Sequence, residues 1–178
     1  MEGRSFAWIA LAALGLAGCA REGDVEPVPY PGEARAEVRD AGGRLLATAS
    51  AADAGDRLRV RVDAAGLAPG SYAAHVHAVG RCDPPEFESA GPHWNPLNRE
   101  HGTQNPQGPH LGDLPNLLVG ADGSGSFEFT IPGASLAGRR LPMLDADGAA
   151  LVIHASADDY RTDPSGNSGA RIACGVFG

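Results

Sequence analysis

Residues 57–63 read Arg-Leu-Arg-Val-Arg-Val-Asp, and this stretch decides the fold class. Leu58, Val60 and Val62 fall on one side of an extended chain, and the charged residues between them fall on the other. Successive side chains of a strand point to opposite faces, so this alternation predicts a β-strand with one buried face and one wet face.

Similar short stretches lie on both sides of it, separated by turns such as Asp40-Ala41-Gly42-Gly43. They cover residues 35–40, 45–50, 71–79, 117–119, 126–131, 149–155 and 171–177. The chain of 178 residues has 25 glycines, 14 prolines and few aromatics. We therefore predict one all-β domain over residues 35–178, an eight-stranded antiparallel Greek-key β-sandwich or flattened barrel with a long metal-binding loop.

The loop from Gly80 to Pro115 shows no periodicity, and a loop this long inside a compact domain must be functional or pinned. It contains His93, His101, His110 and Asp113, while His75 and His77 precede it and His154 follows it. These are all six histidines of the chain. Imidazole binds copper and zinc near neutral pH, so the grouping predicts a metal centre.

Two donor sets can be formed from these residues. Three imidazoles and a carboxylate, from His93, His101, His110 and Asp113, suit a closed tetrahedral zinc site that would hold the loop down. His75 and His77 point to the same face of a strand, and together with His154 and one more imidazole they suit copper(II). The two sets need more imidazoles than the six available, so one ring has to bridge both ions.

Four motifs resemble copper–zinc superoxide dismutase of the bacterial, secreted type. They are Gly91-Pro92-His93-Trp94-Asn95-Pro96-Leu97, Glu100-His101-Gly102, Gly112-Asp113-Leu114 and Ala170-Arg171-Ile172-Ala173-Cys174-Gly175-Val176. The resemblance implies a copper ion held by His75, His77, His93 and His154. It also implies a zinc ion held by His93, His101, His110 and Asp113, with His93 as the bridge.

The same resemblance implies the activity and the roles of nearby residues. Superoxide would be dismutated to dioxygen and hydrogen peroxide by alternation of Cu(II) and Cu(I), with the bridging His93 taking up a proton. Asp158 would link His75 to His101, and Arg171 would attract and orient the anion beside copper. Cys82 and Cys174 match the family disulfide.

The sequence also departs from the family pattern. Ala73 and Ala74 stand where a Gly-Phe pair is common, so packing behind copper should differ. The segment 159–170 lacks the acidic and lysine cluster of many eukaryotic members, and Arg161 is explained equally well as an anion guide and as a solvated loop arginine. The alternative function is a module that stores or delivers copper or zinc without turnover. Arg171 favours the enzyme, since storage needs no cation beside the metal.

The N-terminus predicts export. Phe6 to Ala17 is apolar but too short to span a bilayer, and Leu16-Ala17-Gly18-Cys19 resembles a bacterial lipobox. We expect a signal peptide over residues 1–18, lipidation of Cys19 and a tether rich in proline and glutamate over residues 19–34. The protein would then lie on the periplasmic side of the envelope, with the outer membrane favoured; secretion without lipid is the alternative.

The cysteine count and the net charge limit which other partners are expected. Lipidation of Cys19 leaves Cys82 and Cys174, and an oxidising compartment would let them form a disulfide. The net charge of −8 argues against nucleic acid and requires that superoxide be steered by a local positive surface. Membrane contact would be made only through the anchor. A homodimer is left open, because the loop with Pro84 and Pro85 looks bacterial and eukaryotic dimer contacts do not carry over.

Overall fold

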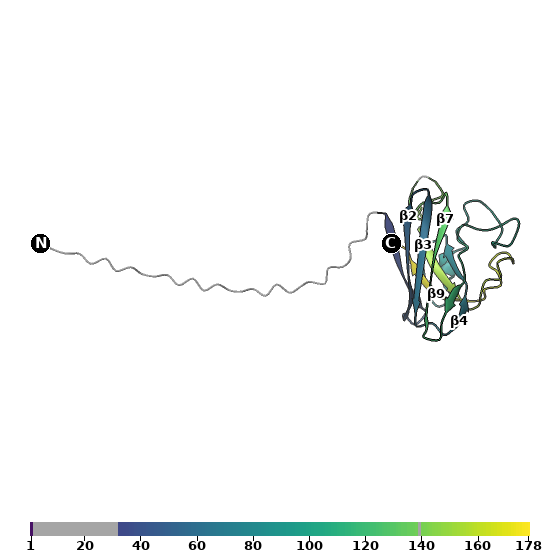
Figure 1. The fold of residues 1–178 in the computed structure, drawn as a ribbon, viewed down its shortest axis with the longest axis horizontal. Helices are drawn as coiled ribbons and strands as arrows, with labels where there is room; N and C mark the ends of the chain where they lie inside the picture. The colour runs from purple at the N-terminus through teal and green to yellow at the C-terminus, as the bar shows by residue number, and fades with distance from the viewer. Residues whose placement is uncertain (2–31, 139) are drawn as a thin grey trace.

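The structure, a computed structural model, describes Met1 and residues 32–138 and 140–178 (Figure 1). The rest of the predicted signal peptide, Cys19 and most of the tether lie outside the described residues. Within the described ranges, no helix has the length and apolar character needed to cross a bilayer. The elements are β1 Glu33–Asp40, β2 Leu45–Ala54, β3 Arg57–Ala65, β4 Gly70–Tyr72, β5 Ala74–His77, the 3-10 helix η1 Glu88–Ala90, β6 Leu117–Val119, β7 Ser124–Pro132, β8 Ala150–His154 and β9 Arg171–Val176.

Seven strands form one antiparallel sheet in the order β5-β8-β9-β1-β2-β3-β7, and β4 pairs with β6 in a separate ladder. β1, β2 and β3 are neighbours in sequence and in space, whereas β7 returns to pair with β3 and β9 returns to pair with β1. These returning strands make an antiparallel Greek-key β-sandwich, so the predicted fold class is confirmed.

The structure has nine strands among its described residues where the sequence predicted eight, because residues 71–79 do not form a single strand. β4 pairs with β6, but β5 pairs with β8 in the large sheet. The chain changes ladders at Ala73, whose N–H donates to Ser156 and whose carbonyl accepts from the N–H of His154. Alternation of side chains does not reveal such a change of partner, since both halves remain extended.

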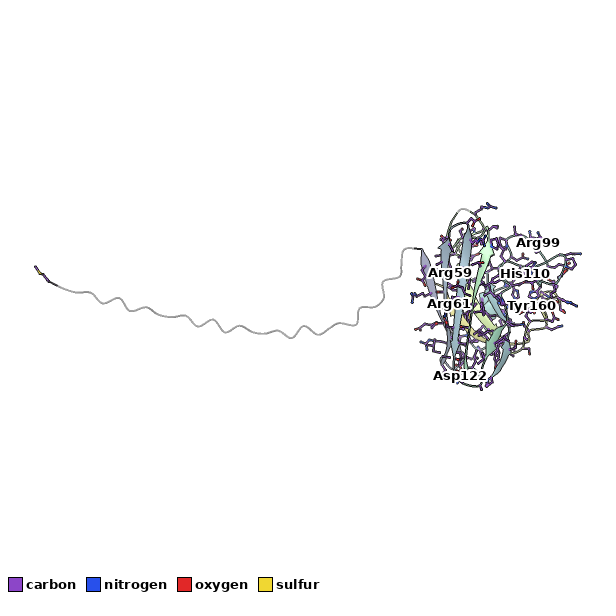
Figure 2. All side chains as sticks on the ribbon, in the orientation of Figure 1. Arg59, Arg61, Arg99, His110, Asp122 and Tyr160 are labelled. Atoms are coloured by element: carbon purple, nitrogen blue, oxygen red, sulfur yellow. A yellow bond between two sulfur atoms is a disulfide. The ribbon has the colours of Figure 1, made fainter. Side chains whose placement is uncertain are left out.

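The core lies beneath the alternating strands. In β3, Leu58, Val60 and Val62 are fully buried, while Arg59 and Arg61 are exposed on the outer face (Figure 2). The same period of two places Ala34, Ala36 and Val38 of β1 against this core. Apolar burial on one face of the sheet therefore sets the strand register.

Two long loops lie on the side of the molecule away from that outer face. We call residues 78–116 and 155–170 the loop half, and β1, β2, β3 and β7 the strand half. The loop half contains η1 as its one helix among the described residues and no strand. Arg99, His110 and Tyr160 belong to it (Figure 2). All predicted loop ligands therefore depend on something other than a regular ladder for their positions.

Candidate metal centre

The buried polar residues of the described chain form one group. They are His75, His77, His93, His101, His110, Asp113, His154, Asp158 and Ser168. All six histidines are included, and each is at most 8% exposed. Buried polar side chains are costly unless they are bonded, so their concentration at one place requires a common explanation.

The loop returns to the free edge of β5, and this fixes two of its side chains. Trp94 N–H donates to the carbonyl of Val76 at 2.8 Å, and Val76 N–H donates to the carbonyl of Gly112 at 2.9 Å. His93 thereby lies opposite His77, and Asp113 lies opposite His75. A Cβ atom on Gly112 would stand 2.3 Å from the Val76 carbonyl oxygen, so this close approach needs glycine.

A first group joins His75 and His77 of β5, His93 of the loop and His154 at the end of β8. One ligand atom from each lies within 4.8 Å of the others. The His75 and His93 ring centroids are 4.1 Å apart, and those of His77 and His93 are 4.8 Å apart. The structure thus brings together the four residues that the sequence proposed for copper.

In three histidines of this group, one ring nitrogen makes a hydrogen bond to another part of the chain. His77 Nδ1 donates to the carbonyl of Gly91 at 2.8 Å, and His154 Nδ1 donates to the carbonyl of Gly169 at 3.2 Å. His75 Nε2 lies 2.9 Å from Asp158 Oδ2. Each contact selects a tautomer in which the remaining nitrogen keeps its lone pair, as a metal ligand must.

A second group surrounds the carboxylate of Asp113. Its Oδ1 lies 2.9 Å from His93 Nδ1, 3.0 Å from His101 Nδ1 and 3.2 Å from His110 Nδ1. His110 Nδ1 and His93 Nδ1 are 3.3 Å apart. Ligands on a tetrahedral ion at about 2.0–2.1 Å are separated by roughly 3.3 Å, so these spacings suit zinc.

His93 belongs to both groups, and its Nδ1 lies in the second. A ligand atom of His75 also lies within 4.8 Å of atoms of His93, His101 and Asp113. Because His75 Nε2 is bound to Asp158, only Nδ1 is free, and His75 can serve one ion at most. His110 Nδ1 lies 3.2 Å from Asp113 Oδ1, so His110 can complete the second group in place of His75.

Asp158 connects the two groups. Its Oδ2 contacts Nε2 of His75 at 2.9 Å, and its Oδ1 contacts Nε2 of His101 at 3.0 Å. The structure therefore places Asp158 between the two histidines that the family resemblance names. A Cβ atom on Gly166 would stand 1.8 Å from Asp158 Oδ1, so the backbone of Gly166 closes this contact from outside.

Two residues that the sequence analysis did not name hold Asp158 in place. The Asn116 side chain donates to the carbonyl of Asp158 at 2.9 Å and accepts from its N–H at 2.8 Å. The hydroxyl of Tyr160 accepts from the Asn116 N–H at 2.8 Å, and the Tyr160 N–H donates to Asp158 Oδ1. These contacts join segments far apart in sequence, and no sequence motif indicated them.

The buried nitrogens without hydrogen bonds test whether metal ions fit. Among the described residues, the buried side-chain atoms without a hydrogen bond are His75 Nδ1, His77 Nε2, His101 Nδ1 and His154 Nε2. His101 Nδ1 lies close to Asp113 Oδ1 but is not aligned for a hydrogen bond. An unbonded buried polar atom costs roughly 1–3 kcal/mol, and a bound cation would remove this cost. The residues therefore fit copper and zinc.

The pKa values of three rings agree with this arrangement, and that of His101 does so only once a cation has displaced its proton. Burial lowers the pKa of His93 to about 4 and that of His154 to about 3, and it also lowers the pKa of His77 well below its usual value. These rings are therefore neutral at pH 7 and carry a free lone pair. Burial alone would lower the pKa of His101, but the carboxylates of Asp113 and Asp158 raise it to about 9.

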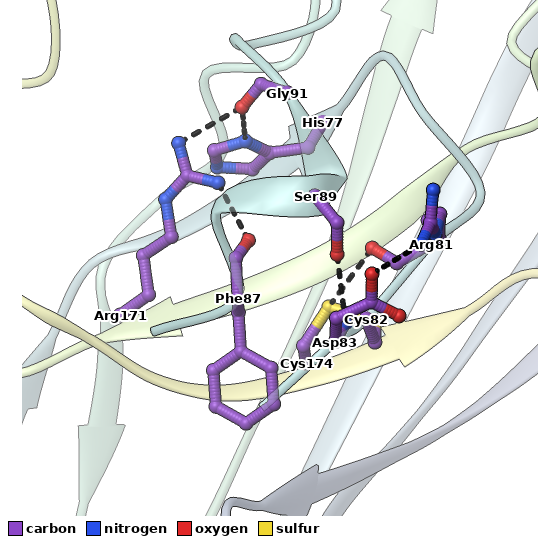
Figure 3. The surroundings of a disulfide bond; sticks show 9 residues. All are labelled: His77, Arg81, Cys82, Asp83, Phe87, Ser89, Gly91, Arg171 and Cys174. Atoms are coloured by element: carbon purple, nitrogen blue, oxygen red, sulfur yellow. Dashed lines mark hydrogen bonds and ion pairs between the residues drawn. A yellow bond between two sulfur atoms is a disulfide. The ribbon is translucent and has the colours of Figure 1, made fainter. Parts of the chain in front are cut away.

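Arg171 begins β9 directly beside the first group. A register shift in the β8–β9 ladder places it opposite His154. Its guanidinium donates to the carbonyls of Phe87 and Gly91, at 2.8 Å each, and the Gly91 carbonyl also accepts from His77 (Figure 3). The cation is thus oriented by backbone oxygens, and no carboxylate of the described residues forms an ion pair with it.

A disulfide joins Cys82 to Cys174 of β9, with their Cα atoms 5.6 Å apart (Figure 3). It attaches the start of the loop to the same strand that carries Arg171. Ser89 Oγ accepts from the N–H of Asp83, which braces the turn between Cys82 and η1. The turn that supplies the Phe87 and Gly91 carbonyls is therefore tied to the sheet.

The first group opens into a cavity of about 890 Å³. Arg171 and Arg99 line it, but so do Glu88, Glu100 and Asp163. The mouth therefore carries charges of both signs, with Arg171 and Arg99 as the cations of the local positive surface expected for steering. Arg161 is exposed, donates to Gln104 Oε1 at 2.9 Å and does not line this cavity.

Comparison with known proteins agrees with the geometry. The sequence model of a family described as copper/zinc superoxide dismutase (SODC) matches residues 42–177. The Cu-Zn superoxide dismutase of Caulobacter vibrioides is 41% identical over 147 residues, which is 81% of this chain and 84% of that protein. Superoxide dismutase-like protein YojM of Bacillus subtilis is 43% identical over 180 residues, covering 94% of this chain and 92% of that protein.

Solved structures show the same likeness. The crystal structure of a SOD-like protein from Bacillus subtilis has a TM-score of 0.75 and 46% identity, and the match covers 80% of this chain and 96% of that one. The structure of the clock protein EA4 has a TM-score of 0.67 and 30% identity over 83% of this chain and 94% of that one.

Proposed function

Because the chain belongs to the copper/zinc superoxide dismutase family, we propose that the two histidine groups described above are its copper and zinc sites. The protein dismutates superoxide to dioxygen and hydrogen peroxide, with copper and zinc as its metals. We assign copper to His75, His77, His93 and His154. We assign zinc to His93, His101, His110 and Asp113.

One observation carries this assignment. The unbonded nitrogens of His75, His77 and His154 belong to one group, that of His101 belongs to the other, and His93 is a member of both. A storage module could use either group alone. A ring shared by two ions hinders the release of either one, and this disfavours the storage and delivery alternative.

When bound, copper supplies the reversible one-electron step between Cu(II) and Cu(I), and zinc holds the shared ring. The residues of the chain supply the rest. The guanidinium of Arg171 binds and orients the anion through its N–H groups, since the Phe87 and Gly91 carbonyls hold it beside the cavity. His93 can hold a proton on Nε2 while Nδ1 stays in the zinc group, and that proton is available for peroxide formation.

Asp158 acts through the histidines and does not touch the substrate. Its two oxygens bind Nε2 of His75 and Nε2 of His101, so they fix both rings with their Nδ1 atoms free for metal. The Asn116 amide holds the backbone of Asp158, and the N–H of Tyr160 donates to its carboxylate. We propose Asp158 as the positioning residue that couples the copper and zinc sites.

The test compares three variants of the metal-loaded protein. His154→Ala should retain zinc, lose copper and lose dismutation, as measured by metal content and by superoxide decay after pulse radiolysis. Arg171→Ala should keep both metals but lower kcat/KM by about tenfold or more. Arg161→Ala removes a cation outside the cavity and serves as the control, with kcat/KM unchanged. Full activity of His154→Ala would contradict the copper assignment.

We also propose export and lipid anchoring. The apolar segment and the motif ending in Cys19 support a signal peptide and a lipidated cysteine, and the Cys82–Cys174 disulfide suits an oxidising compartment. Mass spectrometry of the mature protein should find a diacylglycerol on Cys19, and a Cys19→Ser variant should be released from membranes. Sedimentation of that soluble variant would test whether the protein forms a homodimer.

A further inference from the structure

Glu88 places a negative charge beside the arginine that attracts the substrate. It is the first residue of η1 and follows Phe87, whose carbonyl accepts a hydrogen bond from Arg171. Glu88 and Arg171 both line the metal cavity, and both line the smaller neighbouring cavity of about 440 Å³. The turn that orients the cation therefore also carries an acid into the same opening.

The acid does not neutralise the arginine by direct pairing. Among the described residues, Glu88 makes no ion pair within 4.0 Å, and Arg171 is held by carbonyl oxygens. Burial lowers the pKa of Arg171, and the charge of Glu88 partly offsets this effect. The two charges thus act on each other through space, and both act on any anion that enters the cavity.

The other charged groups of the cavity belong to different segments. Arg99 and Glu100 lie in a loop turn that the Asn95 side chain holds through the Arg99 backbone. Asp163 Oδ1 accepts a hydrogen bond from the backbone N–H of His101 at 2.7 Å. Glu88 is the acid of the Phe87–Gly91 turn, so its charge can be changed without touching a metal contact.

We propose that Glu88 weakens the attraction of small anions to Arg171 and so tunes their binding in the metal cavity. This inference rests on the proposed role of Arg171. An approaching monoanion meets repulsion from Glu88 together with attraction from the guanidinium. Removing one exposed charge from the lining of the cavity changes anion binding by about two- to threefold at low salt. The effect should fade as ionic strength rises, because the charge faces solvent.

The experiment uses the full-length protein loaded with copper and zinc, with Glu88→Gln and Glu88→Lys as variants. Glu86→Gln is the matched control, since Glu86 is exposed and lines only the smaller cavity. Azide is the probe anion, and its affinity is read from the copper absorption spectrum at ionic strengths of about 0.01 M and 0.5 M. The kcat/KM for superoxide is measured on the same samples.

At low salt, Glu88→Gln should bind azide about two- to threefold more tightly than wild type, and Glu88→Lys more tightly again. The kcat/KM for superoxide should rise in the same order, and the differences should shrink at high salt. An unchanged azide affinity in Glu88→Gln, or an equal change in Glu86→Gln, would overturn the proposal. If wild type failed to turn over superoxide, the proposed function would fail, yet the azide titrations would still decide the role of Glu88.

Discussion

Different interactions stabilise the strand half and the loop half of this molecule. β2 pairs with β3 from Ala47 to Ala54 and β3 pairs with β7 along its full length, both without a register shift. The loop half instead touches the sheet through short bridges such as His77 with His93. Its position depends on buried side chains, of which Asp113 and Asp158 make the most contacts to histidines.

The strand half therefore provides most of the stability, and the loop half takes part in the chemistry. The strand half gains its stability from apolar burial and backbone hydrogen bonds that need no cofactor. The metal groups, which the loop half shares with β5 and β8, contain buried polar atoms that protein partners satisfy only in part. Loss of metal should therefore loosen one half and leave the other nearly intact. Four predictions test this contrast.

Removal of both metals should have the largest effect. We expect amides of residues 93–113 and 158–166 to exchange hydrogen at least about 100-fold faster after chelation, because structural metal sites contribute folding energy directly. Amides of β2 and β3 should keep their protection. Hydrogen exchange followed by mass spectrometry measures both regions in one sample. Zinc alone should restore more protection than copper alone, and an even loss over both halves would contradict the division.

Loss of the disulfide should have the next largest effect, because it ties the loop half to β9. The double variant Cys82→Ser and Cys174→Ser removes a covalent link between residues that are 92 positions apart in sequence. The chain-entropy model expects a loss of about 4–5 kcal/mol in the free energy of unfolding. Urea unfolding of the variant measures this loss, and wild type under reducing conditions is the control. A variant as stable as wild type would show that the loop is held without the covalent link.

Asp113→Ala should cost about 3 kcal/mol in metal-free protein, because it leaves buried partners without their carboxylate. Asp113 Oδ2 accepts from the N–H groups of Gly102 and His110. Asp122→Ala is the matched control outside the loop half, in the exposed turn before β7, where Asp122 accepts from Ser124. Urea unfolding followed by tryptophan fluorescence should show a clearly smaller loss for the control. Equal losses would remove the special role of buried carboxylates.

The smallest effect is expected for Arg61→Ala. Arg61 pairs with Asp63 on the outer face of β3, and both side chains are close to half exposed. Exposed ion pairs are screened by water and contribute little to stability. The urea midpoint should match that of wild type within experimental error. A clear loss would mean that the charged face also supports the sheet.

The sequence predicted the strand half well, because its alternation is local. Leu58, Val60 and Val62 identify a strand without reference to any neighbour. The residues that we propose as metal ligands also stand out in the sequence as rare side chains in an ordered series, and the structure brings them close together. The fold class was confirmed by the structure, whereas the single strand over residues 71–79 was wrong, because the exchange of partners at Ala73 leaves no mark on the pattern.

The contacts that place these residues could not be predicted. Asn116 and Tyr160 are ordinary polar residues in sequence, and only folding brings them to Asp158. In the sequence, Glu88 is one surface charge among others. Only the lining of the cavity places it near Arg171. Long-range hydrogen bonds and through-space charge effects depend on distance in space, and spacing along the chain does not encode them.

The bulge in the β8–β9 ladder has one more consequence. It makes His154 and Arg171 direct partners, so the sheet backbone sets the spacing between the proposed copper ligand and the proposed anion-binding cation. Insertions or exchanges in either loop leave that spacing untouched. Deleting a single residue from β8 would instead turn its later side chains to the opposite face and uncouple electron transfer from substrate capture in one step.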